Sequence, residues 1–328
     1  MHAGADVASI GMNEPQTEPA TSTTAVGFFG PFGSFTEQAL RSQPDLAPRD
    51  LVPFASVPDV LDAVTGGLVE LGFVPIENSI EGTVNFTQDA LAFDHNLLIQ
   101  REVVLDIEHC LVGVPGATVD GLKAVLSIPV ATAQCHHFLR RELPDAEVRQ
   151  APSTSDAARQ VAEDGRPEVA AIASRQAAEL YGLDVLLAHI EDHSGNQTRF
   201  VLVGRSGVPA PTGYDRTALV VYQRADEPGS LISILQEFAA RSINLSLLLS
   251  RPTKTSLGDY CFLLDLDGHV SDPVVADCLR TLKATQGGVK FLGSYPAAGP
   301  AGPATRAEVE SEFARAEEWL DDIRDQIR

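Results

Sequence analysis

The chain has 328 residues, of which 44% are apolar and 21% are charged, so it is long enough for about two globular domains with their own cores. Its 24 lysine and arginine residues face 45 aspartate and glutamate residues, and the net charge of −21 argues against binding to nucleic acid or to an anionic membrane surface. An anionic ligand would therefore need a local cationic site.

Targeting and redox features are plain. No stretch of about 18 apolar residues is present, so the sequence predicts no membrane-spanning helix. Residues 1–24 lack the basic start and apolar core of a secretory signal, and we expect them to be a disordered leader. The scattered cysteines form no CxxC pair and indicate reduced, buried thiols in a cytoplasmic protein: Cys110, Cys135, Cys261 and Cys278.

Two segments rich in glycine and proline divide the chain, at residues 204–216 and 296–304. Such segments sustain neither a helix nor a packed strand, so they commonly mark domain boundaries. We therefore expect a large domain over residues 25–204, a small domain over residues 216–295 and a C-terminal amphipathic helix over residues 305–328.

The large domain alternates short apolar runs with capped helical patterns. Strand-like runs occupy residues 26–29, 51–54, 72–74, 169–173 and 200–203. Ser34 and Glu37 form a capping box at the start of one helical pattern, and Ser56 begins another. Strands that alternate with helices favour an α/β fold. The length suits either one large sheet or two small α/β lobes with a cleft between them.

The small domain shows the order strand–helix–strand–strand–helix–strand. Residues 217–222, 243–249, 260–266 and 289–292 are strand-like, one helix is expected over residues 230–241, and another begins at Asp272-Pro273. This is the ferredoxin-like order. The tail has a narrow apolar seam that either docks onto the same chain or forms a coil with another subunit.

Polar segments beside the predicted strands are the candidates for chemistry. Gly27, Gly30 and Gly33 lack the GxGxxG spacing of a dinucleotide site, but the helix start at Ser34 and Thr36 suits an anion. Residues 75–82 follow a strand end, where open α/β sheets bind ligands. Residues 196–200 place one arginine, which can hold a carboxylate in a bidentate fork, beside a threonine hydroxyl. The histidines and acidic residues at 189–193 have no helical alignment, so we expect no metal there.

Taken in order, these segments resemble the prephenate dehydratase family, whose catalytic domain is followed by a regulatory ACT domain. The resemblance covers residues 25–295 and rests on five segments: Gly30-Pro31-Phe32-Gly33-Ser34-Phe35-Thr36-Glu37, Pro75-Ile76-Glu77-Asn78-Ser79-Ile80-Glu81-Gly82, Ala133-Gln134-Cys135, Ser153-Thr154-Ser155-Asp156-Ala157-Ala158 and Asn196-Gln197-Thr198-Arg199-Phe200. It implies a two-lobed, periplasmic-binding-protein-like catalytic domain with its active site in the cleft, and a ferredoxin-like ACT domain. It also implies conversion of prephenate to phenylpyruvate, water and carbon dioxide in phenylalanine biosynthesis, without a cofactor or a metal.

The resemblance assigns roles to individual residues. Thr198 corresponds to the family's essential hydroxyl and Arg199 to its carboxylate anchor, and Asn78 and Gln134 complete the expected catalytic set. The expected substrate-binding residues are Ser34, Thr36, Glu77, Ser79, Ser127 and Phe200. Prephenate becomes aromatic as it loses one carboxyl group and its ring hydroxyl, so a positioned donor and a carboxylate clamp can suffice. Thr198 could give either a hydrogen bond or a full proton.

In the ACT domain, the resemblance implies a phenylalanine site at a subunit interface of a homodimer or homotetramer. The expected residues are Gly229, Ser230, Leu231, Asn244, Leu245, Ser250 and Arg251. Ser230 and Leu249 stand where the family usually has alanine and glutamate, which leaves the sign and strength of phenylalanine regulation open. Two other functions also stay open: dehydration of arogenate, the aminated analogue, and a non-catalytic amino-acid sensor.

Overall fold

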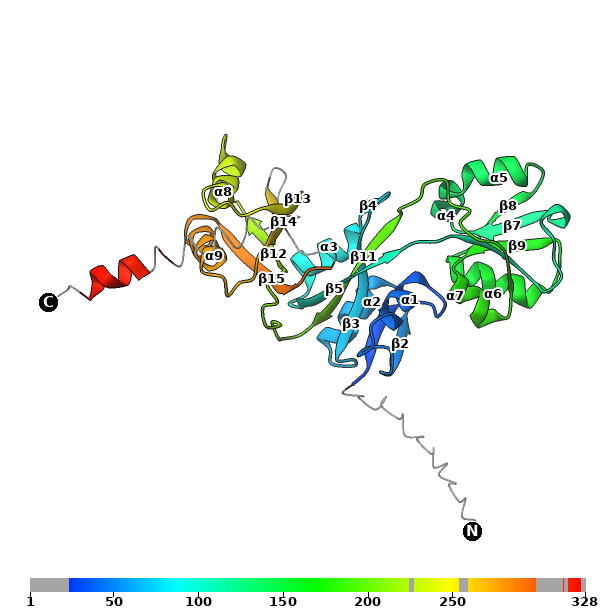
Figure 1. Cartoon of the computed structure of the whole chain (residues 1–328), viewed down its shortest axis with the longest axis horizontal. Coiled ribbons are helices and arrows are strands. Elements are labelled where there is room, and N and C mark those ends of the chain that lie inside the picture. The colour runs from blue at the N-terminus through cyan, green and yellow to red at the C-terminus, as the bar shows by residue number, and fades with distance from the viewer. Residues whose placement is uncertain (1–23, 224–226, 254–258, 299–314, 316–317, 326–328) are drawn as a thin grey trace, which may run out of the picture.

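Three sheets follow one another along the computed structural model (Figure 1), which describes residues 24–223, 227–253, 259–298, 315 and 318–325. The expected leader, apart from Thr24, and most of the expected C-terminal helix lie outside the described residues. In the described part of the tail, Leu320 and Ile323 are exposed, and the helix points away from the three sheets (Figure 1).

The first lobe is built on a six-stranded sheet with the order β2-β1-β3-β11-β5 and with β4 paired to β3. Its strands are β1 (Val26–Phe29), β2 (Leu51–Phe54), β3 (Leu71–Asn78), β4 (Gly82–Thr83), β5 (Leu98–Asp106) and β11 (Gln197–Gly204). Its helices are α1 (Phe35–Arg41), α2 (Val57–Thr65), α3 (Asn85–Asp89) and the π-helical turn η1 (Ala90–Asp94). The hydroxyls of Ser34 and Ser56 accept the backbone N–H groups of Glu37 and Asp59, so both predicted helix caps are confirmed.

The second lobe has its own five-stranded sheet, ordered β10-β6-β9-β7-β8. Its strands are β6 (Cys110–Gly113), β7 (Ala124–Ser127), β8 (Glu147–Gln150), β9 (Val169–Ala173) and β10 (Asp184–Leu187). Its helices are α4 (Pro129–Gln134), α5 (His136–Glu142), α6 (Thr154–Asp164), α7 (Arg175–Tyr181) and the short 3₁₀ turn η2 (Val119–Gly121). Of the two arrangements that the length allowed, the chain therefore adopts two lobes.

The chain crosses between the lobes twice. It leaves the first lobe after β5 and returns to it as β11, which pairs antiparallel with both β5 and β3. The two crossing segments are hydrogen-bonded to each other, from the N–H of Ile107 to the carbonyl of Asn196 at 2.7 Å. Because β11 begins directly after the returning segment, its first residues stand at the junction of the two lobes.

The third sheet is antiparallel, with the order β13-β14-β12-β15, and forms a ferredoxin-like unit. Its elements are β12 (Asp215–Tyr222), α8 (Ser230–Ala239), β13 (Leu245–Pro252), β14 (Tyr260–Asp267), α9 (Pro273–Thr285) and β15 (Gly288–Pro296). Both helices cover one face of the sheet and bury Ile234, Phe238, Cys278 and Leu282 there.

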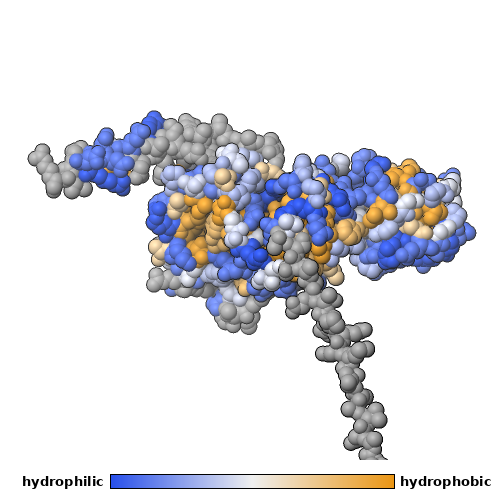
Figure 2. Space-filling view, turned by 90° about the horizontal axis from the view of Figure 1, so that it is seen from below, coloured by the Kyte–Doolittle hydropathy of each residue, from blue (hydrophilic) through white to orange (hydrophobic). Residues whose placement is uncertain are grey.

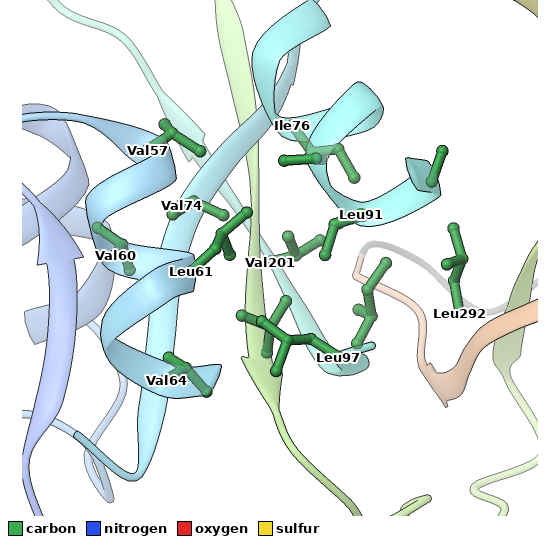
Figure 3. Close-up of a cluster of buried hydrophobic side chains, with 14 of the residues drawn as sticks. Val57, Val60, Leu61, Val64, Val74, Ile76, Leu91, Leu97, Val201 and Leu292 are labelled. Atoms are coloured by element: carbon green, nitrogen blue, oxygen red, sulfur yellow. The ribbon is translucent and has the colours of Figure 1, made fainter. Parts of the chain in front are cut away.

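The other face of this third sheet packs against the first lobe. Ala218, Val220 and Leu292 share one buried cluster with residues of α2, β3 and β11 (Figure 3). The approach is close, because a Cβ atom built on Gly293 would lie 2.3 Å from the carbonyl oxygen of Ile99 on β5. The first lobe and the ferredoxin-like unit are therefore joined by a continuous core.

The surface is mainly hydrophilic on the face shown in Figure 2, with apolar residues gathered in a few separate patches. No helix among the described residues is both long and apolar enough to cross a bilayer. All four cysteines are buried and unpaired, as their spacing predicted.

Candidate active site

Thr198 and Asn78 face each other on adjacent strands at the junction of the lobes. Thr198 is the second residue of β11, and the antiparallel register pairs it with Asn78, the last residue of β3. The Nδ2 atom of Asn78 lies 2.9 Å from the Oγ1 atom of Thr198. Both side chains are only partly buried, so each keeps some exposed surface at the junction of the lobes.

The neighbours of Asn78 decide which way its amide points. Its Oδ1 atom accepts the backbone N–H groups of Ile80 and Glu81, each at 2.9 Å, so its NH₂ group must face Thr198. Since Asn78 donates, the hydroxyl oxygen of Thr198 accepts. The hydroxyl proton of Thr198 is then left to donate to a third group, which is what a hydrogen-bond donor to a ligand requires.

A chain of amides connects this pair to the second lobe. Asn78 also donates to Oδ1 of Asn196 at 2.8 Å, and Nδ2 of Asn196 donates to Oε1 of Gln134 at 3.1 Å. Gln134, at the end of α4, in turn donates to Glu81 of the first lobe at 3.2 Å. We call Asn78, Thr198, Asn196, Gln134 and His109 the inter-lobe cluster, because its members come from both lobes and from the crossing segments.

His109 completes the inter-lobe cluster from the segment before β6. Its Nε2 atom lies 2.9 Å from Oε1 of Gln134, which can only accept, so Nε2 carries the proton and Nδ1 is the acceptor. Burial lowers the pKa of His109 below its usual value, against the opposing effects of Gln134 and Glu191. His109 is therefore a neutral imidazole that holds the amide of Gln134 in one orientation.

The glycine-rich loop before α1, at residues 30–34, contacts the second lobe at the junction. The hydroxyl of Ser155 donates to the carbonyl of Phe32, and the hydroxyl of Ser174 donates to that of Gly33 at 3.0 Å. Gly33 has φ of +80° and its Cβ would lie 2.6 Å from Oγ of Ser155, so only glycine fits there. The loop of the first lobe thus docks onto the starts of α6 and α7 of the second.

Among the expected substrate-binding residues, Ser34 and Thr36 lie on this docked segment. Ser34 is half-buried and its hydroxyl caps α1, whereas Thr36 is 5% exposed. They stand beside the lobe junction, and no contact joins either of them to the inter-lobe cluster among the interactions of the described residues.

The structure places Arg199 away from Thr198, beside which it is expected as a carboxylate anchor. Successive residues of a strand face opposite sides of the sheet, so Arg199 points away from the inter-lobe cluster. Its guanidinium instead binds Glu77 at 3.0 Å, Glu102 at 3.2 Å and Asp265 at 2.9 Å. Burial opposes its charge, but the carboxylates, Asp265 foremost, outweigh burial and hold the pKa of Arg199 above its usual range.

Two other expected residues also lie away from the inter-lobe cluster. Ser127 is fully buried at the end of β7, where its hydroxyl donates to the carbonyl of Ile172 at 2.8 Å. Phe200 is 2% exposed and stacks on Phe73 in the core of the first lobe. Both side chains are therefore packed inside the structure, apart from the inter-lobe cluster.

Glu77 and Ser79 line a different cavity, of about 250 Å³, between the first lobe and the ferredoxin-like unit. Arg199 and Arg216 line the same cavity. The hydroxyl of Ser79 accepts the N–H of Gln197 at 2.9 Å and so fastens the start of β11 to β3. Glu77 pairs with Arg199 in the strand register, as Asn78 pairs with Thr198.

Sequence reasoning missed Asn196, His109 and Glu81 as members or neighbours of the inter-lobe cluster. Asn196 and Glu81 lie within the segments that carry the resemblance. Asn196 could have been singled out, because its amide is two residues from Thr198. His109 offered no such signal, because its partners Gln134 and Glu191 are remote in sequence.

The expected phenylalanine-binding residues fall at two ends of the ferredoxin-like sheet. Gly229, at φ of +93°, Ser230 and Leu231 begin α8, near the end of the sheet where Tyr222 and Arg251 both pair with Cys261. Asn244 and Leu245 stand at the opposite end, where Asn244 donates to Asp267 at 2.8 Å. Ser250 is exposed on β13, and Arg251 is paired with Asp89 of the first lobe at 2.8 Å.

Comparison with known proteins places this architecture. The family model described as prephenate dehydratase matches residues 26–208. The chain belongs to the prephenate dehydratase family. It is 42% identical over 313 residues to the prephenate dehydratase of Mycobacterium leprae, covering 92% of this chain and 95% of that protein. It is 41% identical over 309 residues to that of Mycobacterium tuberculosis, covering 91% and 94%.

Two solved structures are similar to this chain over most of its length. The prephenate dehydratase of Arthrobacter aurescens in complex with L-Phe has a TM-score of 0.82 at 39% identity, over 91% of this chain and 99% of that one. A protein described as a quorum-quenching acylase, GqqA, has a TM-score of 0.76 at 31% identity, over 84% and 98%. The likeness thus extends through both lobes and the ferredoxin-like unit.

Proposed function

We propose that the chain converts prephenate to phenylpyruvate, water and carbon dioxide, with the reacting hydroxyl donor supplied by Thr198. The observation that carries this proposal is the orientation of the Asn78 amide, whose NH₂ group faces the hydroxyl of Thr198 and leaves the threonine proton available to a ligand. Membership of the prephenate dehydratase family supplies the substrate.

The reaction needs little more than a directed donor. As the ring hydroxyl leaves and the carboxyl group departs as carbon dioxide, negative charge develops on the departing oxygen. A preorganised hydrogen bond from Thr198 stabilises that charge, and it does so most strongly in a site from which water is excluded. Gln134 uses one amide hydrogen on Glu81, and its second hydrogen is available to a substrate oxygen.

Arg199 has a different part in this proposal. Its three carboxylate partners leave it no role as the substrate's anchor, so it supports the strand that carries Thr198. The remaining members of the inter-lobe cluster, Asn196 and His109, position Asn78 and Gln134 through the hydrogen bonds described above.

One assay tests this function against its alternatives. Purified protein is mixed with prephenate, and phenylpyruvate is followed by its absorbance. Arogenate is tested in parallel by following phenylalanine, because this substrate keeps its amino group. We expect phenylpyruvate to form and prephenate to turn over faster. Faster turnover of arogenate would assign the aminated substrate, and no product from either acid would favour a non-catalytic amino-acid sensor.

We further propose that the ferredoxin-like unit is an ACT domain that binds phenylalanine between two copies of the chain. In one copy, Leu245 and Arg251 lie six residues apart on β13, or about 20 Å at about 3.3 Å per residue. One amino acid cannot touch both. A second copy related by a twofold axis would bring the Asn244 end of one unit to the Gly229 end of the other, which supports a homodimer or a tetramer built from it.

The surface of this unit supports the same assembly. β13 is the edge strand of its sheet, and an unpaired edge invites pairing with another chain. Leu248 on β13 is 43% exposed and Ile232 on α8 is 60% exposed, so apolar side chains accompany the open edge. The Arthrobacter relative, whose structure contains L-Phe, supports the identity of the ligand.

Replacement of Gly229 by valine tests the phenylalanine site. Its φ of +93° is strained for valine, although a Cβ there would meet no atom within 4 Å. We expect calorimetry to show loss of phenylalanine binding with unchanged basal turnover. Gly165→Val is the matched control, because Gly165 also has positive φ and open space but lies in the second lobe. Normal phenylalanine binding by Gly229→Val would place the ligand elsewhere.

Finally, we propose that the protein acts in the cytoplasm, without membrane or nucleic acid as a partner. Four buried, unpaired cysteines and the net charge of −21 support this. Recovery of the native protein in the cytosolic fraction checks it, and recovery with membranes would contradict it.

A further inference from the structure

A buried group of charges joins the strand of Thr198 to the ferredoxin-like unit. Arg199 on β11 contacts Asp265 of β14 through Nη1 at 2.9 Å, and the same Nη1 contacts Glu102 of β5 at 3.2 Å. Glu102 also accepts from Arg216 of β12 at 2.6 Å. We call these four residues with Glu77 the junction charges. They comprise three carboxylates and two guanidinium groups, drawn from both sides of the domain boundary.

Three of the junction charges are shielded from water, whereas Glu77 is 38% exposed at the cavity. The exposed fraction of the side chain is 9% for Arg199, 1% for Glu102 and 8% for Asp265. Tyr295 lies fully buried beside them, and burial raises its pKa well above the usual value, so it adds no charge. Removing one member of such a buried group leaves the charges of its partners uncompensated, which is strongly unfavourable. The ion pairs therefore resist rearrangement.

The backbone of β11 depends on this anchor near Thr198. Its pairing with β3 shifts register between Arg199 and Phe200, so the regular ladder is interrupted next to Thr198. The partner of Phe200 is Pro75, which has no N–H to contribute. On its other side β11 keeps a regular pairing with β5 through Thr198 and Arg199. On the weakened β3 side, the fixed side chain of Arg199 is an additional constraint on the direction of Thr198.

The other end of the contact reaches the proposed effector site. Asp265 faces an irregularity of β13 between Leu245 and Leu247, and the extra residue, Ser246, has its hydroxyl 3.4 Å from the carbonyl of Asp265. Ser246 also lines the 250 Å³ cavity that contains Arg199. A ligand that moves β13 at Asn244 and Leu245 therefore acts next to Asp265.

We propose that Asp265, although it lies in the ferredoxin-like unit, is a positioning residue for the reaction at Thr198. It holds Arg199, Arg199 holds β11, and β11 directs the hydroxyl of Thr198 toward the substrate. The same contact carries the response to phenylalanine from β13 to the inter-lobe cluster. This inference rests on the proposed dehydratase function.

The test is Asp265→Asn in the full-length chain, which keeps the shape and removes the charge. We expect kcat for prephenate to fall by about 10- to 100-fold, because small misplacements of a catalytic group have effects of this size, while KM changes by less than about threefold. Phenylalanine should still bind by calorimetry but no longer change kcat. Asp277→Asn is the matched control. Asp277 lies on α9, remote from the junction charges, and its carboxylate accepts from Arg241 at 2.8 Å.

Two further measurements separate positioning from general stability. In a double-mutant cycle, Arg199→Gln with Asp265→Asn should lower kcat no more than Arg199→Gln alone, since both act through one contact. Amide hydrogen exchange in the peptide 197–204 should accelerate in Asp265→Asn and not in Asp277→Asn. Additive effects on kcat, an unchanged kcat, or an intact phenylalanine response would each overturn the proposal.

Failure of the dehydratase function would be recognised separately, because the unaltered protein would then form no phenylpyruvate. Hydrogen exchange at residues 197–204 would still decide whether Asp265 holds β11. Asp265→Glu, which retains the charge, should restore most of the slow exchange, and failure to do so would contradict the proposed contact.

Discussion

Replacement of Thr198 by valine removes one hydroxyl and little else. Valine keeps the branched shape and suits a strand. Asn78 loses one acceptor but still donates to Asn196 at 2.8 Å and to Gln197 at 3.2 Å, so its two amide hydrogens remain satisfied. The structural cost is therefore about one hydrogen bond, or about 1 kcal/mol, and the melting temperature should fall by no more than about 4 °C.

The fall in kcat should be much larger, because we assign the hydroxyl proton of Thr198 to the substrate. Loss of a single donor to developing negative charge lowers kcat by about 100- to 1,000-fold, and loss of a general acid by up to about 10,000-fold. These factors correspond to about 2.7–5.4 kcal/mol at about 1.36 kcal/mol per tenfold change. The size of the loss thus helps to separate hydrogen-bond donation from full proton transfer, which the sequence left open.

The measurement is the rate of phenylpyruvate formation at saturating prephenate, with KM determined in the same series. KM should change far less than kcat. Thr285→Val serves as the control, since the hydroxyl of Thr285 bonds only within α9, to the carbonyl of Thr281. A turnover within about threefold of the parent for Thr198→Val would refute the role assigned to Thr198.

Three other predictions follow from the geometry. Burial lowers the pKa of His109 below 6.5, so as the pH falls the unfolded chain binds a proton at this residue before the folded chain does. Denaturant titrations should therefore show the free energy of unfolding decreasing below about pH 6.5, and the decrease should be shallower in His109→Gln. Arg199→Lys should lower the free energy of unfolding by about 1.5–3 kcal/mol, because one ammonium cannot satisfy three carboxylates, whereas a rise in KM with unchanged stability would restore Arg199 as the substrate's anchor. Light scattering at micromolar concentration should show at least a dimer, and Leu248→Asp should shift it toward the monomer; a monomeric parent would contradict the proposed effector interface.

Local patterns in the sequence determined most of the elements on which the function depends. The strands over residues 26–29, 51–54 and 169–173 have the predicted bounds, since short apolar runs flanked by turn residues define them without distant partners. The caps at Ser34 and Ser56 and the ferredoxin-like order were likewise predictable, because they depend on residues a few positions apart. The motif segments also identified Asn78, Thr198 and Gln134 before their contacts were known.

Only the tertiary structure decided how these pieces meet. Two lobes form because the chain leaves after β5 and returns as β11, a pairing between segments about 90 residues apart that no local pattern encodes. That return makes Asn196 and His109 neighbours of Gln134, and it also determines which side of the sheet Arg199 faces. A strand sends successive side chains to opposite faces, so adjacency to Thr198 in the sequence meant separation in space. The guanidinium of Arg199 instead contacts Asp265, 66 residues along the chain, and so joins the first lobe to the ferredoxin-like unit.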